Sequence, residues 1–361
     1  MANNEISEVK KAGTEGDAGY VSVIIPCREE REYIAKAVRA VLANDWPSGR
    51  IEVLVVDGIS RDGTRDILAE IASREPRVKI IDNPGLFAGS AMKIGVAAAR
   101  GDYVVRVDAH AEIPADYVRT GVAILRGHPE IWAVGGPVDR VAGAGRNCLV
   151  AAITSNVFST GNTVFRVGSK EGRIDAVANP VWRREILTRL GDFDDALARN
   201  EDDDYFYRAR RAGGVIYQAQ EMRSRYYVRG SVRQLLKQYN QYAFWKAAVA
   251  KKHARFLDWK PLVPPAFFAA LGLTAAGGFA TPNLWFAGVI LAAAYLCGDV
   301  AASAVVAVKN GFGDFFKALA IFPAFHLAYT AGILAGVWCF YVRGLTPQEI
   351  IRRGVYSGLT R

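Results

Sequence analysis

Cysteine is scarce in this chain. Four cysteines occur among 361 residues, and no two of them have the C-x-x-C spacing that marks redox and metal motifs. Two of the four lie in strongly apolar stretches. We therefore expect reduced, buried cysteines that pack as small apolar side chains, at Cys27, Cys148, Cys297 and Cys339.

The first twenty residues lack a long apolar run. They are polar and mixed in charge, which argues against a cleaved secretory signal. We therefore expect the soluble part of the chain to stay in the cytosol.

Charged residues are nearly absent from the segment 261–341. Stretches 261–280 and 319–341 carry no charged residue, and 284–308 carries only Asp299. Each stretch is close in length to the roughly 20 residues that a helix needs to cross a bilayer. Three such stretches in succession leave no polar face for water, so we expect about three transmembrane helices rather than buried helices of a large soluble core.

Basic residues outnumber acidic ones and give a net charge of +9. Several lie just before the first apolar stretch, so the positive-inside rule places the soluble part on the cytoplasmic side, where these residues meet anionic membrane lipids. They flank apolar stretches rather than forming a stripe with stacking aromatics, so nucleic acid is not an expected partner. Three spans would place the basic tail 343–361 outside, against the same rule. Either one stretch is re-entrant or interfacial, or the tail is an exception.

The chain before residue 255 alternates strand-like and helix-like segments. Short β-branched runs predict strands at 21–25, 51–56, 78–81, 103–107 and 133–138. With amphipathic helices between them, they predict an α/β fold with a mostly parallel sheet and helices on both faces. Ligands of such sheets bind beyond the carboxyl ends of the strands, where Asp57 and Asp108 lie.

Acidic residues follow the strands at intervals. Asp57 ends one apolar run, Asp108 ends another with His110 two residues later, and the run Asn-Glu-Asp-Asp-Asp occupies 200–204. Carboxylates and an imidazole at one edge of a sheet suggest a site for a divalent cation and a phosphorylated donor.

Several short motifs occur in one order along the chain. They are Pro-Cys-Arg-Glu-Glu at 26–30, Asp-Gly-Ile-Ser-Arg-Asp-Gly-Thr at 57–64, Asn-Pro-Gly at 83–85, Asp-Ala-His at 108–110 and the acidic run at 200–204. The set resembles the inverting family 2 glycosyltransferases of GT-A fold. It is especially similar to the ExoA-type branch, the succinoglycan and exopolysaccharide glucosyltransferases. The resemblance covers about residues 20 to 245.

The resemblance implies a Rossmann-like nucleotide-diphospho-sugar transferase domain followed by transmembrane helices. We expect a disordered tail at 1–19, a cytoplasmic catalytic domain at 20–230, an amphipathic and basic juxtamembrane segment at 231–260, transmembrane helices at 261–342 and a basic tail at 343–361. The expected location is a bacterial-type inner membrane, crossed more than once.

The resemblance also implies a UDP-sugar donor and a divalent cation, Mn²⁺ or Mg²⁺. A cation that bridges the donor phosphates neutralises the charge that grows on the leaving group, and Asp108 would hold it. The family has a second acid where this chain has His110. Imidazole suits Mn²⁺ better than Mg²⁺, so His110 is a direct metal ligand, a phosphate contact or only a loop residue.

Further donor-binding residues follow from the resemblance. Asp57 would accept a hydrogen bond from the uracil ring, or it caps the loop that follows it. The loop 26–30 would line the nucleoside pocket, with Pro26, Arg28 and Glu29 as its donor-binding residues. Lys93 stands where the family usually has asparagine, and we assign it to the donor site as well.

An inverting transferase needs a base on the face opposite the leaving nucleotide. In the family this base is the aspartate of a Glu-Asp pair at the start of a helix, which matches Glu201 and Asp202. Crowding by Asp203 and Asp204 should raise the proton affinity of one member of the cluster. Alternatively, the cluster only complements a helix N-terminus.

The family often carries Q-x-x-R-W on a helix over the donor pocket. Gln241 and Trp245 match this motif, and we assign both to donor binding, although Phe244 replaces the arginine. The replacement weakens the case for a cationic pyrophosphate clamp. The segment 232–245 is an amphipathic helix at the membrane surface or an ordinary packed helix.

These features predict a metal-dependent hexosyltransferase. It would move a hexose, with glucose as first candidate, from a UDP-sugar to a polyprenyl-diphosphate-linked glycan during exopolysaccharide biosynthesis. The alternatives are a processive polysaccharide synthase and a non-catalytic scaffold of a polysaccharide export complex. The lost arginine and the lost second acid motivate the scaffold.

Overall fold

The computed structural model describes residues 19–143, 148–161, 171–228, 230–255 and 259–356. The predicted disordered tail, apart from Gly19, and the end of the basic tail lie outside this description. The chain divides into two units: Met1–Asp139 with Val164–Tyr227, and Arg140–Thr163 with Val228–Arg361. The expected catalytic domain 20–230 therefore differs from the first unit, because the segment 140–163 belongs to the second.

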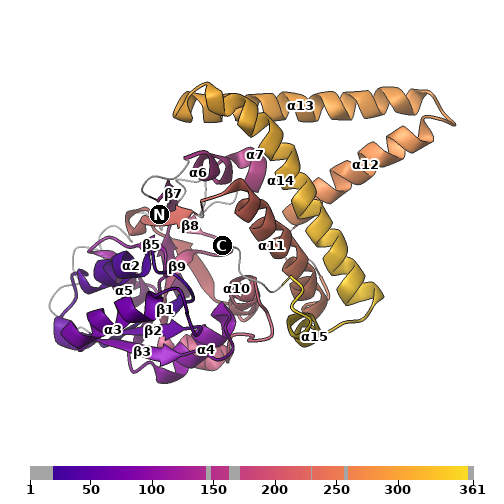
Figure 1. Cartoon of the computed structure of the whole chain (residues 1–361). Helices are drawn as coiled ribbons and strands as arrows, with labels where there is room; N and C mark the ends of the chain where they lie inside the picture. The colour runs from indigo at the N-terminus through magenta and orange to yellow at the C-terminus, as the bar shows by residue number, and fades with distance from the viewer. Residues whose placement is uncertain (1–18, 144–147, 162–170, 229, 256–258, 357–361) are drawn as a thin grey trace. The chain divides into compact units, whose positions relative to one another are not determined.

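An eight-stranded sheet organises the first unit (Figure 1). Its order is β3 (Val78–Asp82), β2 (Ile51–Asp57), β1 (Val21–Cys27), β4 (Tyr103–Arg106), β9 (Ala178–Arg183), β6 (Ile131–Gly136), β10 (Val215–Gln218) and β8 (Gly172–Arg173). The first four strands are mutually parallel, and β10 is parallel to β6. β9 runs antiparallel to both of its neighbours, and β8 runs antiparallel to β10. The predicted α/β fold with a mostly parallel sheet is confirmed.

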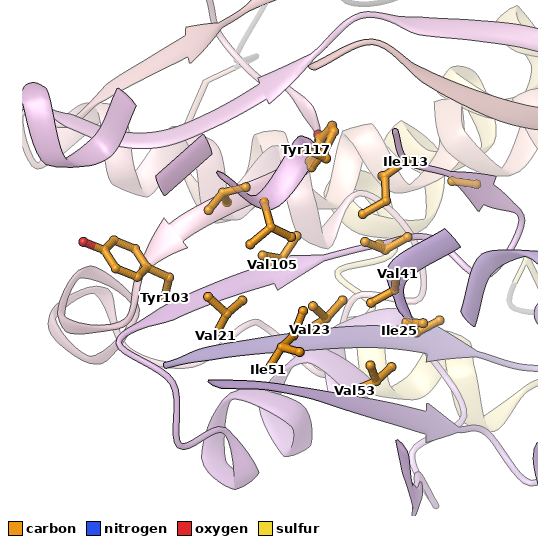
Figure 2. Packing of buried hydrophobic residues seen from close by; sticks show 14 of the residues in the cluster. Val21, Val23, Ile25, Val41, Ile51, Val53, Tyr103, Val105, Ile113 and Tyr117 are labelled. Atoms are coloured by element: carbon orange, nitrogen blue, oxygen red, sulfur yellow. The ribbon is translucent and has the colours of Figure 1, made fainter. Parts of the chain in front are cut away.

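Each face of the sheet has its own apolar core, which explains why the strands are nearly uniform in hydrophobicity. On one face Val23 and Val53 pack with α2 (Ile34–Leu42), α3 (Thr64–Arg74) and α5 (Tyr117–Gly127). Figure 2 shows this packing, with Val41 of α2 close to Ile25. On the other face Ile24 and Leu54 pack with helices that carry their own apolar residues, namely α4 (Ala88–Ala98), α9 (Arg184–Leu190) and α10 (Glu201–Arg211).

A small second sheet extends the carboxyl side of β4. Its order is β5 (Ala111–Glu112), β11 (Ser224–Val228) and β7 (Val138–Ala142). β11 pairs antiparallel with β5, and Tyr226 lies opposite Ala111. This pairing brings residues near 225 next to the segment that follows His110.

The described part of the second unit is mostly helical. Its helices are α6 (Cys148–Thr154), α7 (Val157–Thr160), α11 (Val232–Lys252), α12 (Val263–Gly277), α13 (Asn283–Asn310), α14 (Gly313–Val337) and α15 (Pro347–Arg352), with a π-helical turn Trp338–Val342 after α14. Figure 1 shows α11 alongside α14. Most of the predicted juxtamembrane segment 231–260 thus forms the long helix α11. This helix packs on α14, an apolar helix of the same unit.

Two helices of the described chain are long and apolar enough to cross a membrane, Asn283–Asn310 and Gly313–Val342. We expected about three. The first apolar stretch forms only the 15-residue helix α12, and at about 1.5 Å per residue it is shorter than the roughly 30 Å hydrocarbon core.

All four cysteines are free, but only Cys27 is buried. The expectation of buried side chains is wrong for Cys148 and Cys297, which are exposed. Cys297 lies on α13, where large apolar side chains such as Ile290 are also exposed. The apolar composition of the sequence around Cys297 therefore did not show whether other parts of the protein bury these side chains.

Candidate active site

The loops at the carboxyl edge of the sheet are strained. Glu29, Ile59 and Leu86 follow β1, β2 and β3 and have φ values of 53°, 54° and 68°. Asn179 and Asn200 also have positive φ. Non-glycine residues rarely adopt this region, and such strain gathers at functional sites. All five residues lie where strands or helices begin or end near Asp57, Asp108 and Glu201.

Asp57 ends β2 and is completely buried. Its Oδ1 accepts a hydrogen bond from the Ser60 hydroxyl, and its Oδ2 accepts one from the Ser60 amide at 3.0 Å. Arg65 Nη1 lies 3.1 Å from Oδ2, and Nη2 reaches Asp82 at 2.8 Å. In this structure Asp57 caps the loop that follows it, and its contact with uracil stays a prediction.

The predicted nucleoside loop is tied to the loop after β2. The Glu29 amide donates to the Ser60 hydroxyl at 2.6 Å, and the Arg61 amide donates to Glu29 Oε1 at 2.8 Å. Pro26 and Arg28 are half-buried, and Arg28 Nε is a buried donor without a partner among the described residues. The structure thus brings Pro26, Arg28 and Glu29 together at the edge that also carries Asp57.

A buried arginine links two of the predicted acidic stations. Arg106, the last residue of β4, places Nε 3.1 Å from Asp108 Oδ1 and Nη1 3.2 Å from Glu201 Oε1. The Arg106 side chain is 14% exposed and that of Glu201 7%, so neither charge is well solvated. One guanidinium therefore brings Asp108 and Glu201 together, although they are far apart in sequence.

The Asp108 backbone is fixed by Asn179. The Asp108 amide donates to Asn179 Oδ1 at 3.1 Å, and Asn179 Nδ2 donates to the Ser224 hydroxyl at 3.0 Å. The Tyr117 hydroxyl donates to the Asn179 carbonyl at 2.8 Å. Asparagine tolerates positive φ better than most residues, which suits it to this strained position.

His110 is packed rather than loose. Its Nδ1 lies 3.2 Å from Glu30 Oε1, and its ring meets Tyr226 edge-on at 4.5 Å. The Tyr227 amide donates to the His110 carbonyl at 2.9 Å. His110 Nε2 is buried and has no hydrogen-bond partner in the described part of the chain.

Helix α10 begins with four acidic residues in its first turn. Asp204 is buried and pairs with Arg208 one turn later at 3.1 Å, which fits the expectation of a helix-start charge. Asp202 is exposed, and one of its oxygens accepts the Asp203 amide at 2.9 Å. The exposed member of the cluster is therefore the predicted base.

The charges in this cluster shift each other's protonation. Desolvation and the neighbouring charge of Asp202 raise the pKa of Glu201 to about 7, although Arg106 opposes the shift. Surrounding protein atoms partly desolvate the Asp202 carboxylate despite its exposure, and this desolvation with the charge of Asp203 raises its pKa. Burial works against the charged form of Arg106, but the carboxylates of Asp108, Glu201 and Asp202 raise its pKa above the ordinary value.

Lys93 is engaged by a neighbouring loop. Its Nζ lies 3.2 Å from Asp195 and 3.4 Å from Asp192, and these hydrogen bonds raise its pKa. Lys93 is a half-exposed residue of α4 that joins this helix to the loop before α10. Its role in donor binding stays a prediction.

Gln241 and Trp245 belong to the second unit and are buried in α11. Trp245 Nε1 donates to the Tyr356 carbonyl at 2.8 Å. Phe244 stacks on Tyr356 with ring centroids 4.0 Å apart and also contacts Phe340. Phe244, which stands where the family motif has arginine, thus packs among aromatic rings of its own unit.

The described residues contain no group of three His, Cys, Asp or Glu side chains that could hold a metal ion. A cation that takes most of its oxygens from a diphosphate needs only one or two protein ligands. Asp108 and His110 suit that demand in donor type, because one offers a carboxylate and the other an unpartnered buried nitrogen. They are the residues that would hold such an ion.

Sequence reasoning missed several residues of this site. Arg106 interrupts an apolar strand, and a lone charge in a buried run was the signal that could have marked it. Glu30 and Asn179 gave no such signal, because their partners lie 80 and 71 positions away along the chain.

Comparisons with known proteins indicate one class of enzyme. Residues 22–167 match the family model described as glycosyl transferase family 2. Succinoglycan biosynthesis protein ExoA of Rhizobium meliloti (strain 1021) is 27% identical over 328 residues, which cover 86% of this chain and 92% of that protein. A Methanococcus voltae dolichyl N-acetyl-α-D-glucosaminyl phosphate 3-β-D-2,3-diacetamido-2,3-dideoxy-β-D-glucuronosyltransferase is 25% identical, over 64% of this chain and 74% of its own.

Among solved structures, a mannosyltransferase from Pyrobaculum calidifontis, in complex with GDP-mannose and Mn²⁺, has a TM-score of 0.56. Its identity is 20%, and the match covers 93% of this chain and 94% of that chain, so this likeness speaks for the fold alone. The family match over residues 22–167 and the relatives make this part of the chain similar to family 2 glycosyltransferases, and its sheet has a GT-A-like fold.

Proposed function

We propose that the chain is an inverting hexosyltransferase of polysaccharide or glycolipid biosynthesis. It moves a hexose, with glucose as first candidate, from a UDP-sugar to a polyprenyl-diphosphate-linked glycan during exopolysaccharide assembly. The similarity to ExoA supports the pathway class, and the relative named for a dolichyl phosphate sugar supports a lipid-linked acceptor.

The observation that carries the proposal is the arrangement around Arg106. It joins Asp108, the residue assigned to the diphosphate, to Glu201, the neighbour of the assigned base. Asp202 is exposed and has a raised pKa, so it can reach an acceptor hydroxyl and has more affinity for its proton than an ordinary aspartate. A base of this kind serves the attacking oxygen in an inverting transfer.

On the donor side, a divalent cation would neutralise charge on the departing diphosphate when bound. Asp108 and His110 would hold it, while Pro26, Arg28 and Glu29 line the nucleoside pocket with Asp57 beneath their loop. Gln241 and Trp245 complete the assignment as donor-binding residues of α11, and Lys93 is assigned to the same site.

The test is UDP release by the full chain in detergent, with UDP-glucose, Mn²⁺ and a lipid-linked glycan acceptor. Asp202→Asn should lower turnover by about 10²- to 10⁴-fold, the usual contribution of a general base. UDP affinity should stay unchanged. Asp203→Asn is the matched control and should keep most activity. Full activity of Asp202→Asn would refute the assignment of the base.

The donor can be narrowed without an acceptor. A ligand that binds only the folded state raises the apparent stability, so a set of UDP-sugars should be compared for metal-dependent thermal stabilisation. UDP-glucose should give the largest shift. A chain that neither binds UDP nor releases it would favour the non-catalytic scaffold.

We further propose that the protein crosses a bacterial inner membrane more than once, with the first unit in the cytoplasm. Lys251 and Lys252 end α11 shortly before the apolar helices, as the positive-inside rule expects of a cytoplasmic flank. Reporter fusions after residue 255 and after residue 311 would test the orientation. If an odd number of spans separates the two fusion points, the reporters should lie on opposite sides of the membrane. If an even number separates them, the reporters should lie on the same side.

A further inference from the structure

We propose that Glu30 is a positioning residue for His110. It holds the imidazole by Nδ1, so that Nε2 would keep its lone pair for the divalent cation that the donor site would bind. The inference rests on the proposed function, and it gives a specific role to Glu30, which the sequence placed only within the 26–30 loop of the expected nucleoside pocket.

Backbone hydrogen bonds hold both residues in addition to the contacts of their side chains. The Glu30 amide donates to the Thr64 hydroxyl at 2.8 Å, which anchors the acid at the start of α3. The ring of His110 lies edge-on against Tyr226, and its backbone carbonyl accepts the Tyr227 amide. The side chains are 13% exposed for His110 and 9% for Glu30, so water competes little for their 3.2 Å contact.

The chemistry of this pair defines the tautomer. An ionised carboxylate is an acceptor only, so a neutral ring beside Glu30 carries its proton on Nδ1 and keeps a lone pair on Nε2. Metal-binding histidines in proteins commonly donate the other ring N–H to a carboxylate, which orients the ring and raises its basicity. Nε2 of His110 is a buried atom without a hydrogen-bond partner in the described chain, as expected of a nitrogen kept for a ligand.

A second pair in the chain shows which features matter. His128 Nδ1 lies 3.4 Å from Glu130 Oε1, and His128 Nε2 is also buried without a described partner. However, Glu130 is 52% exposed and precedes the amino end of β6, so it lies at the edge of the sheet opposite to Asp108. An unpartnered nitrogen therefore does not mark a site by itself. His110 is distinguished by its buried acid and by its place two residues after Asp108.

The experiment measures Mn²⁺ affinity in the presence of UDP, by electron paramagnetic resonance of free Mn²⁺ with the full chain in detergent. Glu30→Gln is nearly isosteric but removes the charge. It should weaken Mn²⁺ binding by about 10- to 100-fold, as changes behind a metal ligand usually do. Glu30→Asp keeps the charge at a shorter reach and should recover part of the affinity. Glu130→Gln, the matched control, should bind like the wild type.

The double variant decides whether Glu30 acts through the ring. If it does, Glu30→Gln adds no further loss once His110→Ala has removed the imidazole. Equal affinity of Glu30→Gln and wild type, or losses that add in the double variant, would overturn the inference alone. A wild-type chain that binds neither UDP nor Mn²⁺ would instead overturn the proposed function. The melting temperature of every variant is measured to check that each one is folded.

Discussion

At the scale of single residues, Glu201 makes stability depend on pH. Its pKa is raised from 4.5 to about 7 by desolvation and by Asp202, so between these values the folded chain binds more protons than the unfolded chain. The free energy of unfolding therefore falls as pH rises through this window. At about 1.4 kcal/mol per pKa unit, the loss is on the order of 3 kcal/mol.

Glu201→Gln should remove the part of this dependence that Glu201 contributes, because an amide does not titrate. Thermal unfolding of the full chain in detergent, followed from pH 4.5 to 7, should show a flatter profile for this variant than for the wild type. Glu70→Gln, which changes an exposed acid paired with Arg74, should leave the slope as it is. Equal slopes in Glu201→Gln and wild type would contradict the prediction.

At the scale of elements, α14 approaches α11 through two glycines. A Cβ on Gly332 would lie 2.2 Å from the Asn240 carbonyl oxygen, and one on Gly336 would lie 2.6 Å from that of Phe244. Both obstacles are backbone atoms, which cannot swing away as a long side chain can. Gly332→Ala should therefore destabilise the helix pair by about 1–3 kcal/mol, the usual effect of overpacking.

Gly272 in α12 provides the matched control, since a Cβ there has no atom within 4 Å. Alanine is favoured over glycine inside a helix by about 1 kcal/mol, so Gly272→Ala should keep or raise the melting temperature. The comparison is made by thermal unfolding in the same detergent. A Gly332→Ala chain as stable as Gly272→Ala would mean that the two helices do not pack as closely as described.

Sequence patterns predicted several buried strands, but not β9 and β10, which are also mostly buried. β1, β2 and β4 are apolar on both faces, so their runs were visible without any partner, and Asp57 and Asp108 at their ends followed from the rule for parallel sheets. The contacts within the site were not visible. Glu30 meets His110 across 80 positions, and Arg106 takes its meaning from two acids that only the fold brings together.

The same limit applies to the apolar helices. Hydropathy marks a segment as apolar but not where it turns, so the stretch 261–280 was expected to span and forms the 15-residue α12 instead. The assignment of Gln241 and Trp245 used only the match of residue types to the family motif. The sequence did not show that Phe244, between them, packs against the rings of Phe340 and Tyr356, about a hundred positions further along the chain.

At the scale of the whole molecule, α13 decides how the chain meets the membrane. This helix has a mean hydropathy of 2.0 over its best window, of which only 22% is buried within the protein. Leu296, near its middle, is 55% exposed. A large uncovered apolar surface is unfavourable in water, so we expect the wild-type chain to stay with membranes after alkaline carbonate extraction.

Leu296→Asp should lower the membrane-bound fraction, because aspartate at the centre of a spanning helix costs about 2.5–3.5 kcal/mol on insertion. Leu296→Ala removes the same side chain without adding charge, and it should remain in the membrane pellet. The pelleted fraction of each variant is measured after carbonate treatment of cell membranes. A wild-type chain in the supernatant would mean that α13 is covered by protein rather than lipid, and equal fractions for the two variants would contradict the prediction for Leu296→Asp.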